Sequence, residues 1–323
     1  MRVSAEQEPI FKKALAAADA FVAVDDQGKT QLLAGIDSLD GILLKTRRFA
    51  EAKSVLAAFA ARPNRQDEDN LQFVEAAYKY FKATGDKSFT DKVNAIVSNY
   101  KGYKYGLSLE SQALAYNALL IADEFNGNKA NLESAEKYQT NILAVIARGA
   151  TNFAPLQALW QDGTFLVRPS ALLLACLSHN GALLPEAMQA GLVKAIDSQK
   201  FSPAGLLGPD NSVHPGLMGM YALAKERVLS RDPKVNFEQV QQIVNTFSNY
   251  LSAELMARGT MCEAYSTGSP IAGKGEFANA GSVAAMMEML SISMTKREPT
   301  AKEVEDEAAT PAFEQIVKVL SAG

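Results

Sequence analysis

Three consecutive segments, LQFVEAAYKYFKATGD (71–86), FTDKVNAIVSNY (89–100) and SLESQALAYNALLIADEF (108–125), decide the fold class of this chain. In each of them apolar residues recur every three or four positions, which is the spacing of an amphipathic helix. Gly85 follows the first segment and Asn126-Gly127 follows the third, and both are typical helix stops. This part of the sequence therefore predicts three helices joined by short turns.

The same spacing continues in both directions along the chain. Further helices are predicted over residues 4–22, 39–46, 49–60, 131–149, 169–178, 184–196, 215–229, 235–257 and 278–294. Strand-like alternation is confined to FVAVDD (21–26) and TFLV (164–167). About a dozen helices with so few strands predict an all-α protein. Periodicity alone leaves open whether the helical hairpins stack as a solenoid or close into a ring.

Composition excludes several classes of partner. The chain has 323 residues, 48% of them hydrophobic, with 36 acidic against 32 basic residues and a formal charge of −4. Nucleic acids and anionic membranes attract concentrated positive charge, so neither is expected as a partner. No apolar run approaches the roughly 20 residues of a transmembrane helix. Cys176 and Cys262 are too few for a disulfide framework, so we expect two buried thiols in a cytoplasmic protein.

The composition changes near residue 296, which predicts two parts. Residues 1–295 form one large helical domain, and residues 296–323 form a charged linker followed by a short C-terminal helix. Phe313, Ile316, Val317 and Leu320 share one face of that helix. We favour docking of this face on its own domain. The alternative is a tethered peptide for the groove of a protein partner.

The sequence contains no motif that supports a nucleotide cofactor, a metal ion or a nucleic acid as a ligand. AGKGEFANAG (272–281) has dinucleotide-like glycine spacing, but no buried strand precedes it, so no nucleotide cofactor is expected. His179 and His214 have no nearby cluster of Cys, Asp and Glu with metal-ligand spacing, so no metal site is expected. YKGYKYG (100–106) interleaves basic and aromatic residues, and we interpret it as a helix end and turn.

Carboxylates in loops and at helix starts are the remaining candidates for chemistry. Glu263 lies between two predicted helices, beside Tyr265. Glu68, Asp69 and Glu110 lie at the starts of helices, where an acid also complements the positive end of the helix dipole. Each of these residues therefore has a structural explanation as well as a functional one.

Several of these stretches together resemble the α-glucosidase domain of glycogen debranching enzymes, the amylo-α-1,6-glucosidases. RPNR (62–65) is similar to the family's I-P-N-R, and VRPSALLLACLS (167–178) to its I-R-P-N-Q segment. The other similar segments are 15–35, 40–60, 71–86, 108–122 and 263–287, in the family's order over roughly residues 14–292. The resemblance implies an (α/α)₆ toroid, six helical hairpins around one axis with the active site at one mouth.

The resemblance also implies roles for five residues. Glu263 falls on the family's general base, and Glu68 falls on its general acid, which is an aspartate in the family. Members of this clan invert the anomeric configuration, with the two carboxyl groups roughly 6.5–9.5 Å apart. Arg65, Glu110 and Tyr265 would then contact the sugar.

The chain departs from the family at the mouth of the toroid. The family's tryptophan-rich loop with its substrate-holding Arg-Asp pair is missing, because Gly35 is followed directly by Ile36. The family's H-Q-G-x-x-W-P-W segment is shortened to HPGLMG (214–219), and Trp160 is the only tryptophan in the chain. Sugars bind by stacking on aromatic rings and by bidentate hydrogen bonds, so these losses remove binding energy.

Three functions follow from this pattern. We favour a pseudoenzyme that keeps the scaffold and acts as a structural or interaction subunit, with a protein partner or in a larger assembly. The second is an active inverting glycoside hydrolase of the debranching α-glucosidase type, with Glu263 as base and Glu68 as acid. The third is a non-catalytic glucan-binding module.

Overall fold

Helices α3 (Asp67–Thr84) and α5 (Leu109–Asn126) form as the apolar spacing predicts. Helix α3 ends at Gly85 (φ 74°) and α5 ends at Gly127 (φ 66°), both in the left-handed conformation that glycine adopts without strain. The side chain of Ser108 accepts a hydrogen bond from the Ser111 N–H at 3.0 Å and caps the start of α5. The computed structural model describes residues 8–26, 28–63, 65–148, 160–161, 164–165, 169–197, 201–202, 205–208, 210–231, 249–267 and 271–292.

Inner and outer elements alternate along the chain. The inner ones are η1 (Ile36–Ser38), η2 (Asp40–Leu44), α3, α5, α8 (Pro169–Cys176), α10 (Pro215–Leu229) and α12 (Ala280–Ile292). The outer ones are α1 (Glu8–Asp19), α2 (Phe49–Ala61), α4 (Thr90–Val97), α6 (Leu132–Arg148), α9 (Glu186–Asp197) and the helical residues 249–258. Two short 3₁₀ turns, η3 (Ser98–Tyr100) and η4 (His179–Gly181), lie in the connections.

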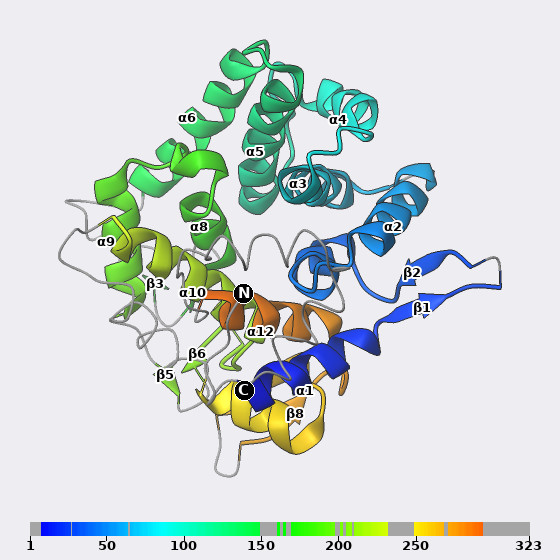
Figure 1. The fold of residues 1–323 in the computed structure, drawn as a ribbon. Coiled ribbons are helices and arrows are strands. Elements are labelled where there is room, and N and C mark those ends of the chain that lie inside the picture. The colour runs from blue at the N-terminus through cyan, green and yellow to red at the C-terminus, as the bar shows by residue number, and fades with distance from the viewer. Residues whose placement is uncertain are drawn as a thin grey trace, which may run out of the picture.

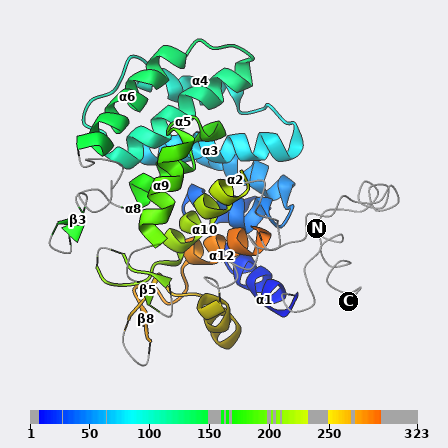
Figure 2. The same cartoon turned by 90° about the vertical axis from the view of Figure 1, so that its left-hand side faces the viewer.

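The inner elements close into a ring. Element η2 contacts α3, α3 contacts α5, and the contacts continue through α8 and α10 to α12, which packs back on η2. Figure 1 follows this ring from α3 and α5 to α12, and Figure 2 shows α9, α10 and α12 packed next to one another. The protein is an all-α (α/α)₆ toroid, so the ring is confirmed over the solenoid. In an (α/α)₆ toroid each hairpin pairs an outer helix with an antiparallel inner one, so the inner helices start at the same end of the ring.

The strands form four short antiparallel hairpins. They are β1 (Val22–Val24) with β2 (Thr30–Leu32), β3 (Trp160–Gln161) with β4 (Thr164–Phe165), β5 (Phe201–Ser202) with β6 (Gly205–Leu206), and β7 (Ala264–Tyr265) with β8 (Gly273–Lys274). The strand predictions within 21–26 and 164–167 are thereby confirmed.

The segment over residues 39–46 differs from the regular helix that its spacing predicts. It is a short π-helix, η2, and the Thr46 hydroxyl donates to the carbonyl oxygens of Ile42 and Leu43 at 2.8 and 3.0 Å. Gly41 brings this turn against the backbone of Ala284 in α12, where a side chain would not fit. A close approach to α12 has therefore replaced the regular helical geometry.

Three further predictions concern the domain boundary, the cysteines and membrane-spanning helices. The described helices and strands run from residue 8 to residue 292, whereas the predicted linker and helix over 296–323 lie outside the described residues. Both cysteines are free and buried, as expected. Among the described residues, no helix combines the length and hydropathy needed to cross a bilayer.

Candidate functional site

A cavity of about 1180 Å³ follows the axis of the toroid. Its wall includes residues of η1, η2, α3, α5, α8, α10 and α12, so every hairpin of the ring contributes to it. The acidic residues on the wall are Asp37, Asp40, Glu68, Glu75, Glu110, Glu226 and Glu288. Their burial differs: Asp40 is buried, Glu75, Glu110, Glu226 and Glu288 are partly buried, and Asp37 and Glu68 are exposed.

An ion pair between η2 and α3 lies on the cavity wall. Lys79 Nζ is 2.8 Å from Asp40 Oδ2, and the side chain of Asp40 is only 12% exposed. Desolvation alone would raise the pKa of Asp40, but the charges of Lys79 and Lys45 outweigh it and lower that pKa. Desolvation would likewise lower the pKa of Lys79, but the charges of Asp40 and Glu288 raise it. Asp40 and Lys79 are therefore both ionised at neutral pH.

Three other carboxyl groups of the cavity hold their protons more tightly than usual. Burial raises the pKa of Asp37 in η1, of Glu75 in α3 and of Glu288 in α12, although Lys79 partly opposes this rise in each case. Carboxyl groups with raised pKa thus stand near an ionised one, Asp40. Enzymes that need a general acid beside a carboxylate use such an arrangement.

Asn117 in α5 fixes the orientation of Glu75. Its side-chain oxygen accepts a hydrogen bond from the backbone N–H of His179 at 2.9 Å. Its amide nitrogen must then face Glu75, and it donates to Glu75 Oε1 at 2.6 Å. Glu75 is therefore held against α5 through a side-chain amide whose own orientation is set by the backbone.

His179 lies on the cavity wall in a paired state. Its Nε2 is 3.1 Å from Glu124 Oε2, which also accepts a hydrogen bond from the Tyr78 hydroxyl at 2.8 Å. Burial lowers the pKa of His179, although the Glu124 carboxylate opposes this shift. The imidazole is therefore neutral near pH 7 and serves as an ordered hydrogen-bonding group of the wall.

Two of the five residues selected from the sequence lie on the cavity wall. Glu68 is in the first turn of α3 and Glu110 is in the first turn of α5, at the end of the ring where the inner helices start. Gln72 Nε2 donates to Glu68 Oε1 at 3.4 Å.

Arg65 is not among the residues of the cavity wall. Its guanidinium carbon lies 5.0 Å from the ring centre of Phe59 and 5.4 Å from that of Phe73. Burial lowers the pKa of Arg65, against the charge of Asp69. The side chain therefore packs as a cation over two aromatic rings, between α2 and α3.

Glu263 and Tyr265 belong to the hairpin β7–β8 and are not among the wall residues either. Glu263 is exposed; its N–H donates to the Glu276 carbonyl at 2.9 Å, and its Oε2 accepts from the Glu276 N–H at 3.3 Å. Tyr265 is fully buried, and its hydroxyl accepts a hydrogen bond from the Cys262 N–H at 3.0 Å. Both residues thus have structural partners in their own hairpin.

Five cavity residues were not predicted from the sequence: Asp37, Asp40, Glu75, Lys79 and Glu288. Glu75 and Lys79 are four residues apart on one helix, a spacing that is typical of an ordinary surface ion pair. Nothing in the local sequence distinguishes a helix face that points to bulk solvent from one that points to the axial cavity. In the part of the chain that the structure describes, no group of three or more His, Cys, Asp or Glu side chains is arranged to hold a metal ion.

The raised pKa of carboxyl groups in the cavity predicts that the stability of the fold depends on pH. A group whose folded-state pKa lies above its unfolded value destabilises the fold as pH rises from the unfolded pKa, 4.5 for glutamate, through the folded one. Glu288→Gln removes this penalty, and we expect it to raise Tm by roughly 2–4 °C at pH 7.5, as about 1 kcal/mol would. Thermal unfolding followed by circular dichroism at pH 4 and pH 7.5 measures the effect.

The gain should disappear at pH 4, where the wild-type carboxyl is protonated in both states. Glu133→Gln on the exposed surface of α6 is the control, and its Tm should change by less than about 1 °C at either pH. An equal gain for Glu288→Gln at both pH values would contradict the titration as its cause.

Comparison with known proteins identifies the fold. No protein-family model and no curated protein matches this chain. Among solved structures, it is similar to the GH76A α-1,6-mannanase from Salegentibacter sp. HEL1_6, with a TM-score of 0.59 and 11% identity over 88% of this chain and 98% of the mannanase. An inactive variant of that enzyme in complex with α-1,6-mannotetrose gives a TM-score of 0.60 and 11% identity over 90% and 99% of the two chains.

A third similar structure is an unsaturated glucuronyl hydrolase specific for heparin. Its TM-score is 0.57, with 10% identity over 88% of this chain and 96% of the hydrolase. All three neighbours are glycoside hydrolases, and each is matched along nearly its whole length. At this level of identity the comparison establishes the fold, which is the six-hairpin toroid of these glycosidases.

Proposed function

We propose that this chain binds a neutral carbohydrate chain in its axial cavity and has lost the hydrolytic pair of the debranching enzymes that its sequence resembles. The observation that carries the proposal is the cavity of about 1180 Å³, whose wall combines apolar side chains with amides and charged groups. Pockets for drug-sized ligands hold roughly 300–1,000 Å³, so this cavity has room for an oligosaccharide.

The chemistry of the wall suits a polyhydroxylated ligand. Gln72, Asn117 and Asn180 supply amides, and the Asp40–Lys79 pair and the carboxyl groups supply further donors and acceptors. Sugar hydroxyls both donate and accept hydrogen bonds, so they can satisfy such mixed groups. The α-1,6-mannanase with a similar fold is known in complex with α-1,6-mannotetrose, which makes a neutral oligosaccharide the natural ligand to test.

Two observations support the loss of hydrolysis by the Glu68–Glu263 pair. Glu263 is exposed and bonded within its own hairpin, whereas Glu68 lies on the cavity wall. The sequence also lacks the Arg-Asp loop and the tryptophans of the debranching enzymes. A bond is hydrolysed by an inverting pair only when both carboxyl groups face it from opposite sides. We propose that any role in an assembly with a protein partner builds on this glycan-binding scaffold.

A second candidate function is hydrolysis by the cavity's own carboxyl groups. The raised pKa of Glu288 and Glu75 would let either protonate a leaving oxygen, while Asp40 stays ionised. In this alternative the chain is an active glycoside hydrolase whose acid and base differ from those implied by the family resemblance.

The proposal is tested by titrating the purified full chain with maltoheptaose and with α-1,6-mannotetraose in a calorimeter. Gly216 lies on the cavity wall in the first turn of α10, and no atom lies within 4 Å of the Cβ that a side chain would add. We expect Gly216→Leu to obstruct the cavity and weaken saccharide binding at least tenfold. The matched control is Gly191→Leu, on α9 and away from the cavity, where Cβ also has free space.

Chromatography of the same mixtures after prolonged incubation separates the alternatives. Saturable binding without product, lost in Gly216→Leu, supports the proposal. Release of sugar that stops in Glu288→Gln or Glu75→Gln would establish the hydrolase instead. No binding of either saccharide by the wild-type protein would overturn the cavity as a glycan site.

A further inference from the structure

The segment over residues 101–107 leads directly into the cavity wall, because Ser108, Leu109 and Glu110 follow it and line the cavity. It contains Tyr105, which is 86% exposed and the most exposed large apolar side chain of the described residues. The ring of Tyr103 meets that of Tyr105 edge-to-face, with centres 5.1 Å apart. An exposed ring, Tyr105, and its half-buried neighbour Tyr103 thus precede the wall residues Ser108–Glu110 by only a few positions in the sequence.

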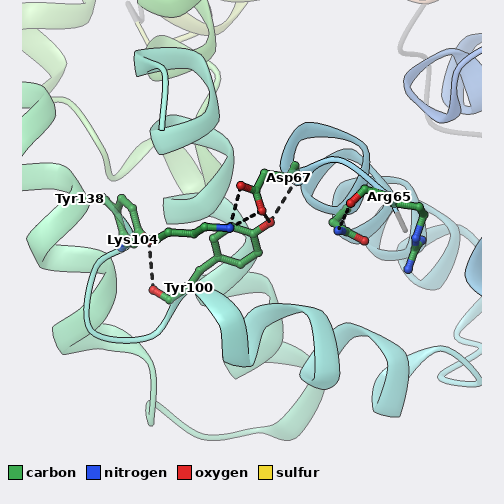
Figure 3. A network of polar contacts seen from close by, with 6 residues as sticks. Arg65, Asp67, Tyr100, Lys104 and Tyr138 are labelled. Atoms are coloured by element: carbon green, nitrogen blue, oxygen red, sulfur yellow. Dashed lines mark hydrogen bonds and ion pairs between the residues drawn. The ribbon is translucent and has the colours of Figure 1, made fainter. Parts of the chain in front are cut away.

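The segment is anchored at its centre. Lys104 Nζ is 2.6 and 2.7 Å from the two carboxylate oxygens of Asp67, which also accepts a hydrogen bond from the Tyr100 hydroxyl at 2.7 Å (Figure 3). The Lys104 N–H donates to the Tyr138 hydroxyl at 2.9 Å. Asp67 immediately precedes Glu68 of the cavity wall, so the anchor ties this segment to the start of α3.

The anchor also holds a strained backbone. Tyr103 has φ 89°, in the left-handed region, where a non-glycine residue is disfavoured. Gly102, at φ 78°, precedes it, and the Gly102 N–H donates to Ser134 Oγ at 3.0 Å. Strained conformations of this kind persist only where the surroundings enforce them, and they concentrate at ligand sites.

Packing within the protein explains the position of the Tyr103 ring but not that of the Tyr105 ring. Tyr103 lies against Tyr138, with ring centres 4.9 Å apart, and its hydroxyl is 3.3 Å from Gln112 Oε1. Tyr105 has no such cover. Exposing this ring to water is unfavourable. The backbone that carries it is nevertheless anchored, through the contacts of Gly102 and Lys104.

We propose that Tyr105, supported by Tyr103, is an outer subsite that stacks on a sugar ring of a glycan chain extending out of the cavity past residues 108–110. The occupant is a neutral sugar, because the charge of Lys104 is already compensated by Asp67. An exposed aromatic ring on an anchored backbone segment can stack on the apolar face of a pyranose. This inference rests on the proposed glycan binding. It assigns to Tyr105 the recognition of glycans long enough to extend out of the cavity.

The test compares a long with a short saccharide on the full-length protein. We expect Tyr105→Ala to weaken binding of maltoheptaose, or of α-1,6-mannotetraose, about five- to tenfold, and to leave binding of the corresponding disaccharide unchanged. Tyr105→Phe should bind both as the wild type does, because it keeps the aromatic plane. Leu33→Ala, which truncates an exposed apolar residue next to the projecting hairpin β1–β2, is the control and should change neither affinity (Figure 1).

The outcomes distinguish this inference from the proposed function. If the wild type binds the long saccharide and Tyr105→Ala binds it equally well, the outer subsite is wrong while the cavity site stands. If the wild type binds no saccharide, both proposals fail. Thermal unfolding should give the same Tm for Tyr105→Ala and the wild type, since the ring is exposed; a loss of stability together with binding of both lengths would assign Tyr105 a structural role instead.

Discussion

Gly41→Ala is expected to destabilise the protein by about 3 kcal/mol or more. A Cβ added at Gly41 would lie 2.4 Å from the carbonyl oxygen of Ala284 and 2.5 Å from its Cα. Both atoms are backbone of α12, so no side-chain rotation relieves the clash, and the inner helix must move away from η2. Overpacking in a core costs typically 1–3 kcal/mol and more where the backbone has to shift.

The effect of this substitution should reach the cavity. Asp40 precedes Gly41 in η2, and Glu288 lies one turn after Ala284 in α12, so moving α12 separates the two carboxyl groups that share Lys79. We therefore expect weaker saccharide binding as well as lower stability. Urea unfolding followed by circular dichroism gives the free energy of unfolding, and calorimetry on the folded fraction gives the affinity.

Gly191→Ala is the matched control for this prediction. Gly191 lies in α9, and a Cβ there would meet no atom within 4 Å. Alanine in an unobstructed helix should stabilise the protein by about 0.5–1 kcal/mol. If Gly41→Ala unfolded at the same urea concentration as the wild type, the close approach of η2 and α12 would not limit this fold.

Lys79→Met is expected to cost about 2–3 kcal/mol at pH 7. Asp40, with only 12% of its side chain exposed, would lose the ammonium group at 2.8 Å that satisfies it. Hydrogen bonds to charged groups contribute roughly 1.5–3 kcal/mol, and the charge of Lys45 remains as the other cation that acts on Asp40. The other carboxyl groups of the cavity would lose the cation that favours their charged forms, so they would hold protons to still higher pH.

The pH dependence of the stability loss in Lys79→Met tests whether the Asp40–Lys79 ion pair is its cause. The lowered pKa of Asp40 contributes stability above its unfolded value of 3.8 and loses it as pH falls through the folded pKa. The raised pKa of Lys79 contributes stability below its unfolded value of 10.5. The difference between wild type and Lys79→Met should therefore be present from about pH 5 to pH 10 and shrink toward pH 3, as measured by urea unfolding across this range.

Lys137→Met provides a control of equal exposure. The side chain of Lys137 is 47% exposed, against 46% for Lys79, but its partner Glu133 is 84% exposed. Exposed pairs of this kind contribute about 0.3–0.5 kcal/mol. Equal losses for the two lysine variants would show that the burial of Asp40 does not matter.

Much of the fold can be predicted from local sequence. The apolar spacing predicted α3 and α5, and Gly85 and Gly127 end them because glycine takes the left-handed conformation without strain. The strand at 22–24 was likewise visible from alternation. The closure of the ring was not visible from periodicity and followed only from the family resemblance, because hairpins of a solenoid and of a toroid have the same local pattern.

The candidate site was predictable only in part. Glu68 and Glu110 were chosen as acids at helix starts, and the structure places both on the cavity wall, where their function remains a prediction. Glu263 was chosen as a loop carboxylate beside Tyr265, and the resemblance supplied their roles; in the structure they lie at the hairpin β7–β8 and are not among the wall residues. The close approach of Gly41 to α12 could not be predicted from the local sequence, because Ala284 is more than 240 residues away along the chain.

The sequence by itself determined that this chain forms helices, where α3 and α5 end, and that its surface is mildly acidic. These properties depend on hydrogen bonds and side-chain spacing within a few turns, which neighbouring residues specify. Only the tertiary structure decided that Asp40, Lys79 and Glu288 share one cavity, and that Tyr105 is exposed. The physical reason is that a charge on a helix has the same local sequence whether it faces bulk water or the axis of a ring, and only the packing of distant helices sets which of the two it faces.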